Sequence, residues 1–192
     1  YQLVYRAELR TLARADLVVT VGGDGTVLQA SHFVTDQPVL GVNSDPARSE
    51  AVFCAATART FAPLLHRVLA DRLPQRRLFR LRVRLNGKPL GPLVLNDVLI
   101  AHDDPATMSR YRLRIDARRE LQKSSGLWVA TAAGSSSAIR AAGGRALVWT
   151  ARQFQYRPRE LYQGRLSRSR LIGGVLSRRQ TVDMAWLMRE GA

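Results

Sequence analysis

The hydrophobic positions of the first 73 residues follow two different spacings. Short, continuous apolar runs predict buried strands, and longer stretches with apolar residues three or four positions apart predict helices. The expected elements are helix 2–15, strand 17–21, helix 26–34, strand 38–42 and helix 57–73. Strands that alternate with helices favour a parallel sheet. We therefore expect residues 1–73 to form a parallel α/β domain with fewer strands than a nucleotide-binding sheet normally has.

After residue 77 the pattern changes to alternation of apolar and polar positions. Apolar residues alternate with arginines from 78 to 85 and again around Leu113, as expected for strands with one buried face. The pair Asn86-Gly87 is typical of a tight turn between antiparallel strands. We therefore expect residues 74–192 to form a second domain that is mostly antiparallel and resembles a β-sandwich.

The composition is typical of a globular protein with a strongly basic surface. Hydrophobic residues make up 46% of the 192 positions, and the formal net charge is +15, almost all of it from arginine. Such a charge attracts polyanions, which include ATP, polyphosphate, dinucleotides and nucleic acids. The arginines are spread along the chain without an obvious recognition helix, so a nucleic-acid partner is not favoured.

Three further observations concern membrane insertion, the cellular compartment and metal binding. No apolar stretch reaches the roughly 20 residues that a membrane-spanning helix needs. The single cysteine, Cys54, cannot form an internal disulfide, which favours a reducing, cytoplasmic compartment. The histidines His32, His66 and His102 lack the spacing of metal ligands, so we expect no metal site built from protein side chains alone.

The most informative motif is Gly22-Gly23-Asp24-Gly25-Thr26, which joins the strand at 17–21 to the helix at 26–34. Glycines in such a turn let a ligand approach the backbone, and N–H groups at a helix N-terminus bind phosphate. A carboxylate repels phosphate, so Asp24 needs a role of its own, such as accepting a proton or helping to hold a metal. The plain alternative is a strand–turn–helix in which Asp24 only caps the helix.

Two weaker motifs follow. Residues 124–138 run from an apolar strand into a glycine and serine turn, and Ser135, Ser136 and Ser137 supply small donors that suit a polar ligand. Asn96-Asp97 stands at the mouth of the apolar strand 95–100 and offers one donor group and several acceptors, which suit the edge of a sugar or a base. Each of these motifs alone also fits an ordinary loop.

In this order the three motifs resemble those of the NAD kinase family. Residues 19–28 are similar to its first glycine-rich signature, Asn96-Asp97 to its amide–acid pair, and residues 131–144 to its second glycine-rich signature. Three other stretches look closest to the plant-type NADH kinase branch: 41–46, Ser109-Arg110 and Ser124-Ser125-Gly126. The agreement of several spaced motifs, over roughly residues 15–160, makes the resemblance specific.

The resemblance implies transfer of a phosphoryl group from ATP or polyphosphate to the 2′-hydroxyl of the adenosine ribose of NAD or NADH. Asp24 would act as the base for that hydroxyl, and Mg²⁺ would bridge the donor phosphates. The donor phosphates would lie on Gly22, Gly23, Gly25 and Thr26. The dinucleotide would be held by Asn96, Asp97, Lys123, Thr131, Gly134, Ser135, Ser136 and Ser137. The intact enzyme is expected to be a homo-oligomer.

The chain departs from the commoner family pattern at two positions. Ser125 stands where many members have Asp, and Ala138 stands where many have Tyr. Both family residues contact the dinucleotide, so the pocket here is expected to lack a charge and an aromatic ring. This departure moves the expected preference from NAD toward NADH. The small number of N-terminal strands and the stop after a strand-like run at 181–188 lead us to expect a fragment shortened at both ends.

Two alternatives stay open, one from the same superfamily and one from a different class of function. A lipid kinase of the diacylglycerol type shares the first glycine motif, but it would need an apolar cleft for an acyl chain, and the serine-rich second motif argues against that. A basic module that binds nucleotides or nucleic acid without catalysis would use the net charge of +15 alone, and its RNA binding would depend strongly on salt.

Overall fold

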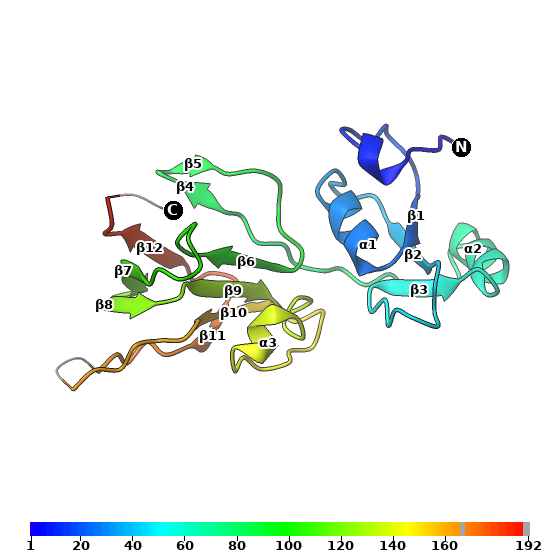
Figure 1. Ribbon diagram of the computed structural model, residues 1–192. Coiled ribbons are helices and arrows are strands. Elements are labelled where there is room, and N and C mark those ends of the chain that lie inside the picture. Colours follow the sequence, from blue (N-terminus) through cyan, green and yellow to red (C-terminus); the bar gives the residue numbers. More distant parts are fainter. Residues whose placement is uncertain (166–167, 190–192) are drawn as a thin grey trace. The chain divides into compact units, whose positions relative to one another are not determined.

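The computed structural model describes residues 1–165 and 168–189, and the described chain contains two compact units. The first unit comprises residues 1–77 and 82–93, and the second comprises residues 78–81 and the chain from residue 94 onward (Figure 1). Each unit is described by itself below.

The first unit is built on a parallel sheet of three strands in the order β1-β2-β3 (Figure 1). Its elements are β1 (Val18–Gly22), α1 (Asp24–Ser31), β2 (Val39–Asn43), β3 (Cys54–Thr57) and α2 (Phe61–Leu69). Helix α1 contacts β1 and β2 and buries Val27, Ala30 and Ser31. The predicted parallel strands and the helix between them are therefore present, each shifted by one to three residues.

Two predictions for this unit need correction. The helix predicted over residues 2–15 is wrong, because the structure has only a single 3-10 turn there, η1 (Arg6–Glu8). Leu3 and Tyr5 are exposed at 71% and 67%, and Leu9 is the only apolar residue of this segment that is buried, so packing would do little to stabilise a helix here. Strand β3 was not predicted, because Cys54-Ala55-Ala56-Thr57 is short and has weak β-propensity.

Helix α2 is shorter than the predicted helix over residues 57–73. It begins at Phe61, after Thr60, and ends at Leu69, shortly before Asp71 adopts a positive φ of 52°. Its Pro63 lies in the first turn, where a missing backbone N–H costs little. None of its residues is fully buried, although its apolar residues lie on one side.

The predicted turn at Asn86-Gly87 is present. It joins β4 (Arg84–Leu85) to β5 (Lys88–Pro89), and its two residues have φ of 51° and 80°. Positive φ at both central positions is what a type I′ hairpin turn requires. The strand predicted over 78–85 is mostly absent, since only β4 and an isolated bridge between Leu81 and Val94 pair there.

The second unit consists of two antiparallel sheets, in the orders β11-β10-β9-β6 and β12-β7-β8 (Figure 1). The first contains β6 (Asp97–Ile100), β9 (Leu127–Thr131), β10 (Gln153–Pro158) and β11 (Gly174–Ser177). The second contains β7 (Ser109–Ile115), β8 (Arg118–Ser124) and β12 (Val182–Trp186). A short helix, α3 (Ala138–Ala141), follows β9.

The two sheets enclose a common hydrophobic core. Along β7, residues alternate strictly between buried and exposed, so Tyr111, Leu113 and Ile115 point inward while the arginines between them face outward. These side chains pack in one cluster with Leu127 and Val129 of β9 and with residues of β10 and β11. This arrangement is the antiparallel, sandwich-like domain that the alternating pattern predicts. Within the described residues, no helix is both long and apolar enough to cross a membrane.

Candidate functional site

The Gly22–Thr26 turn forms at the end of β1, where the chain reverses into α1. Gly22 has a φ of 154°, and a Cβ on it would collide with the hydroxyl oxygen of Thr26. Any other residue at position 22 would therefore push the turn open. Gly23 caps the helix, and its carbonyl accepts the N–H of Thr26 at 3.0 Å. The helix N-terminus and its positive dipole end thus lie directly after the strand.

Asp24 occupies the first position of α1, and both of its carboxylate oxygens accept hydrogen bonds from another loop. The N–H of Val52 donates to Oδ2 at 3.0 Å, and the N–H of Phe53 donates to Oδ1 at 2.7 Å. Asp24 thereby fixes the segment that leads into β3. Partial burial, together with the Asp24 charge, raises the pKa of the Cys54 thiol, which favours its protonated form.

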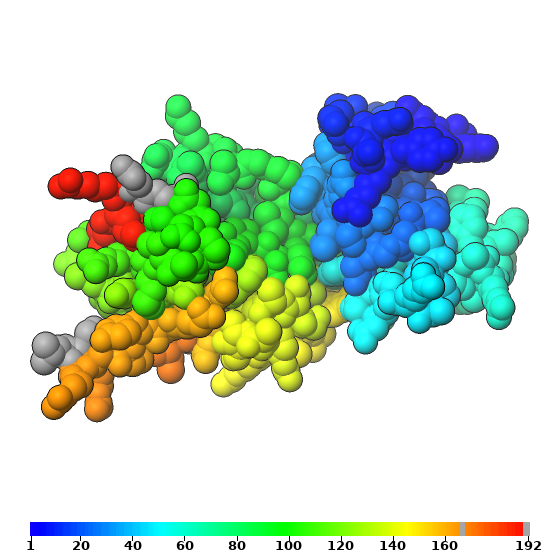
Figure 2. All heavy atoms as spheres, in the orientation of Figure 1, coloured from blue at the N-terminus to red at the C-terminus, as the bar shows by residue number. Residues whose placement is uncertain are grey.

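A feature that the sequence analysis did not identify is the position of Arg6. The N-terminal segment lies on the surface of the first unit (Figure 2), and Arg6 Nε donates to Gln29 Oε1 at 2.6 Å while Gln29 Nε2 donates to the Arg6 carbonyl at 3.0 Å. The two terminal nitrogens of Arg6 lie 3.5 and 3.6 Å from where a Cβ on Gly25 would be. An amide rather than a carboxylate holds this guanidinium, so its charge is not neutralised by that contact.

Arg6 and Gly25 belong to the lining of an open cavity of about 650 Å³ on the outer side of α1. The cavity has a basic part and an apolar part. Its lining consists of Arg6, Leu9, Arg10, Gly25, Leu28, Gln29, His32 and Phe33. No sequence motif marks Arg6, because its position depends on how the N-terminal segment folds over α1.

In the second unit, the structure brings Asn96 and Asp97 together with the turn that follows β9. The backbone N–H of Thr131 donates to the Asn96 carbonyl at 3.0 Å, and the Thr131 hydroxyl donates to the Leu95 carbonyl at 2.5 Å. Gly134 lies so close to Asn96 that a Cβ on it would collide with the Asn96 carbonyl oxygen. The amide–acid pair and the second glycine-rich turn therefore form one structural group.

The side chains of this group are partly buried. Asn96 Nδ2 donates to Ser137 Oγ at 3.0 Å. Asp97 Oδ2 is buried and has no hydrogen-bond partner within the described chain. Burial raises the pKa of the Asp97 carboxyl, and a hydrogen bond from Ser137 lowers it by less. An acceptor oxygen without a partner is costly, and a ligand that donates to it would relieve that cost.

The remaining predicted binding residues divide into two kinds. Thr131 and Ser135 are each exposed by only 1%, and the Ser135 hydroxyl donates to the Ala132 carbonyl and accepts the Leu147 N–H. Their side chains therefore stabilise the turn from inside. Ser136 is exposed. Lys123 lies on β8, in the other sheet, with its ammonium group 5.4 Å from the centre of the Tyr162 ring.

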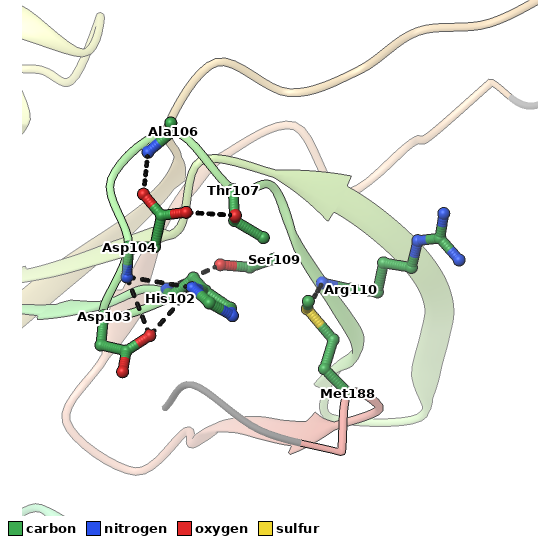
Figure 3. A network of polar contacts seen from close by, with 8 residues as sticks. All are labelled: His102, Asp103, Asp104, Ala106, Thr107, Ser109, Arg110 and Met188. Carbon is green, nitrogen blue, oxygen red and sulfur yellow. Dashed lines mark hydrogen bonds and ion pairs between the residues drawn. The ribbon is translucent and has the colours of Figure 1, made fainter.

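A second polar cluster lies in the loop between β6 and β7 (Figure 3). His102 Nδ1 accepts the N–H of Asp104 at 3.0 Å, and the N–H of His102 donates to Ser109 Oγ at 3.0 Å. Asp104 in turn accepts bonds from Ala106 and Thr107. These contacts close the loop on itself. Across residues 1–165 and 168–189, no group of three or more His, Cys, Asp or Glu side chains could hold a metal ion.

Comparison with known proteins agrees with the motifs and the geometry. Residues 5–73 match the ATP-NAD kinase N-terminal domain. The chain is 38% identical to a probable NADH kinase of Oryza sativa subsp. japonica and 36% identical to an NADH kinase of Arabidopsis thaliana, each over 92% of this chain. Over most of its length the chain is therefore similar to members of the NAD kinase family. It spans 61% and 62% of the length of these two plant relatives.

Two solved structures of the NAD kinase family share the fold. An NAD kinase from Archaeoglobus fulgidus, in complex with ATP, superposes with a TM-score of 0.73 at 22% identity, over 89% of this chain and 65% of that one. A yeast NADH kinase complexed with NADH superposes with a TM-score of 0.74 at 18% identity, over 93% and 50%. The predicted fold, a parallel α/β part followed by antiparallel sheets, is confirmed. The lipid-kinase and nucleic-acid alternatives gain no support from these relatives.

Proposed function

We propose that the protein transfers a phosphoryl group from ATP or polyphosphate to the 2′-hydroxyl of the adenosine ribose of NAD or NADH. The observation that carries this proposal is the placement of an acid, Asp24, at the N-terminus of a helix that follows a glycine turn. The named activities of the plant relatives and the ATP and NADH bound to the two structural neighbours support it.

The first unit would hold the phosphate donor. Gly22, Gly23 and Gly25 would place backbone N–H groups around the phosphates, because phosphate binds well at a helix N-terminus after a glycine turn, and Thr26 would offer its hydroxyl group. Arg6 adds a guanidinium beside Gly25, which suits a charge-assisted contact with a phosphate oxygen.

Asp24 would accept the proton of the ribose hydroxyl. Each of its oxygens accepts one backbone N–H, which leaves each oxygen a second lone pair. The donor set also fits Mg²⁺, because this ion is commonly held by one or two carboxylates together with substrate phosphates. Asp24 would be the protein ligand, and the ion would neutralise charge on the transferred group. Catalysis would otherwise rest on positioning the two substrates.

The second unit would hold the dinucleotide. Asn96 and Asp97 would pair with a polar edge of the acceptor, and the buried Asp97 Oδ2 would take a donor from it. Ser136 is exposed on the same turn and could reach the ligand. Lys123 would attract the pyrophosphate through its charge. A homo-oligomer and a cytoplasmic location remain predictions.

A direct assay tests the proposal. The purified full chain is incubated with Mg·ATP or with polyphosphate, and with NAD or NADH, and the NADP(H) formed is measured enzymatically. We expect NADP(H) to accumulate with at least one donor. A folded chain that binds neither ATP nor NADH and forms no NADP(H) would overturn the proposal, and an RNA mobility shift sensitive to salt would then favour the basic binding module.

A further inference from the structure

Ser137 lies at the N-cap position of α3, yet its side chain does not cap the helix. Serine at this position normally accepts a backbone N–H from the first helical turn. Here the hydroxyl oxygen instead accepts Asn96 Nδ2 at 3.0 Å, across 41 residues of sequence. The serine therefore lacks the local contact that favours it at a helix start and instead contacts Asn96, the residue before β6.

The same hydroxyl also reaches the neighbouring acid. The Ser137 side chain also lowers the pKa of the Asp97 carboxyl, and its proton can be donated on that side because its oxygen already accepts from Asn96. The other oxygen of Asp97, Oδ2, stays buried without a partner among the described residues. Ser137 thus joins the two members of the amide–acid pair and leaves one acceptor of that pair for a ligand.

The backbone around Asn96 is already fixed by other contacts. Thr131 binds the carbonyls of Leu95 and Asn96, and Gly134 packs directly on the Asn96 backbone. What remains free at Asn96 is rotation of its side chain, including the 180° flip that exchanges Oδ1 and Nδ2. The Ser137 contact with Nδ2 opposes that flip and leaves Oδ1 and one N–H of the amide for a ligand.

We propose that Ser137 is a positioning residue: it fixes the orientation of the Asn96 amide toward the dinucleotide and does not itself contact the ligand. This inference rests on the proposed function, because it assigns the role of one residue within the acceptor site. It differs from the role given to Ser137 by the resemblance, in which the hydroxyl lines the dinucleotide site directly.

A double-mutant cycle separates the two roles. NADH binding to the full chain is followed by fluorescence titration in Ser137→Ala, Asn96→Ala and the double variant. A positioning role predicts a roughly five- to tenfold weaker affinity in Ser137→Ala, as for loss of one hydrogen bond, but almost no further loss when Asn96 is already Ala. A direct ligand contact predicts losses that add. Additive losses, or an unchanged affinity in Ser137→Ala, would overturn the inference.

Two further variants control for folding. Ser137→Thr keeps the hydroxyl and should retain most of the affinity. Ser177→Ala removes an exposed serine from β11 in the same unit and should bind NADH like the parent chain. All variants should unfold at similar temperatures, which thermal denaturation checks. A Ser137→Thr variant that is folded but as weak as Ser137→Ala would count against the hydroxyl as the cause.

NMR spectra recorded without ligand test the role of Ser137 even if the proposed function is wrong. If the parent chain binds no NADH, the acceptor assignment is wrong, but the orientation of Asn96 can still be measured. The side-chain amide signals of Asn96 in ¹H–¹⁵N NMR spectra should shift and broaden in Ser137→Ala and stay in place in Ser177→Ala. Signals that do not change in Ser137→Ala would overturn the inference independently of any activity.

Discussion

The two glycine-rich turns of this chain look alike in sequence but use their glycines differently. Around residues 22–26 the turn is partly exposed, and its acid holds a neighbouring loop through backbone N–H groups. Around residues 131–137 most of the turn is buried, and its glycine lies against Asn96. In the first turn Gly25 is exposed beside Arg6, whereas in the second turn Gly134 makes room for the protein's own Asn96.

The largest expected effect in this comparison concerns Asp24. Asp24→Asn keeps the size of the side chain and one acceptor oxygen but removes the base, so turnover should fall by roughly 10²–10⁴ while NADH affinity changes little. The thermal midpoint should fall as well, because Asp24 anchors the loop through Val52 and Phe53 and one N–H loses its partner. Kinetics measured well below the variant's thermal midpoint separate loss of the base from loss of stability. Near-normal turnover in the folded variant would remove Asp24 as the base.

The next effect concerns the buried turn. Gly134→Ala places a methyl group against the Asn96 carbonyl, and such overpacking costs about 1–3 kcal/mol of stability. Gly87→Ala is a control for glycine replacement itself, since a Cβ there meets nothing within 4 Å, although its φ of 80° carries some strain. We expect Gly134→Ala to lose both stability and NADH affinity, measured by denaturant titration and fluorescence. A Gly134→Ala variant with full NADH affinity would show that the turn does not set the position of Asn96.

A substitution of Arg6 tests whether the turn at residues 22–26 binds the phosphates of ATP. Arg6→Ala removes the guanidinium beside Gly25, and loss of one charge-assisted phosphate contact should raise the KM for ATP roughly fivefold with little change in the KM for NADH. Arg14→Ala removes one equally charged, exposed residue of the same segment and controls for net charge. Equal KM values for ATP in the two variants would exclude a specific contact by Arg6.

Asp97 lies at the start of β6, beside the buried turn, and its substitution should change both the stability of the chain and its affinity for NADH. Its pKa lies above the ordinary value of 3.8 because burial penalises the charge, so at neutral pH the ionised carboxylate destabilises the folded chain. Asp97→Asn should therefore raise the free energy of unfolding by about 1 kcal/mol, a small value because the residue is only partly buried, and should weaken NADH binding. The gain should shrink as the pH falls through the folded-state pKa toward 3.8, where the parent takes up its proton. A variant less stable than the parent at pH 7 would contradict this assignment.

The sequence was most informative where a short pattern determines the backbone. Gly22 and the strand–helix junction around it, the Asn86-Gly87 turn and the alternation along β7 were all predictable, because period and turn chemistry are local. The N-terminal helix was predicted wrongly because amphipathic spacing does not show whether a surface exists to cover it. The inward orientation of Ser135 and the positions of Arg6 and Ser137 depend on contacts between distant segments, which one sequence does not reveal.

The smallest expected effect concerns Ser125 and the preference between NAD and NADH as the acceptor. Ser125 lies between β8 and β9, and its N–H donates to the Arg159 carbonyl at 2.9 Å, so its backbone is fixed while its side chain is half-buried. Oxidised nicotinamide carries a positive charge that a nearby carboxylate stabilises, and the reduced ring does not. A single charge contact near the surface contributes at most a few kcal/mol, so we expect the neutral Ser125 to shift the preference toward NADH without excluding NAD.

Ser125→Asp should raise the ratio of kcat/KM for NAD to that for NADH, and more strongly at low salt. Ser125→Asn, which has the shape without the charge, should leave the ratio near that of the parent. If Ser125→Asp and Ser125→Asn give the same ratio, this position does not sense the nicotinamide charge.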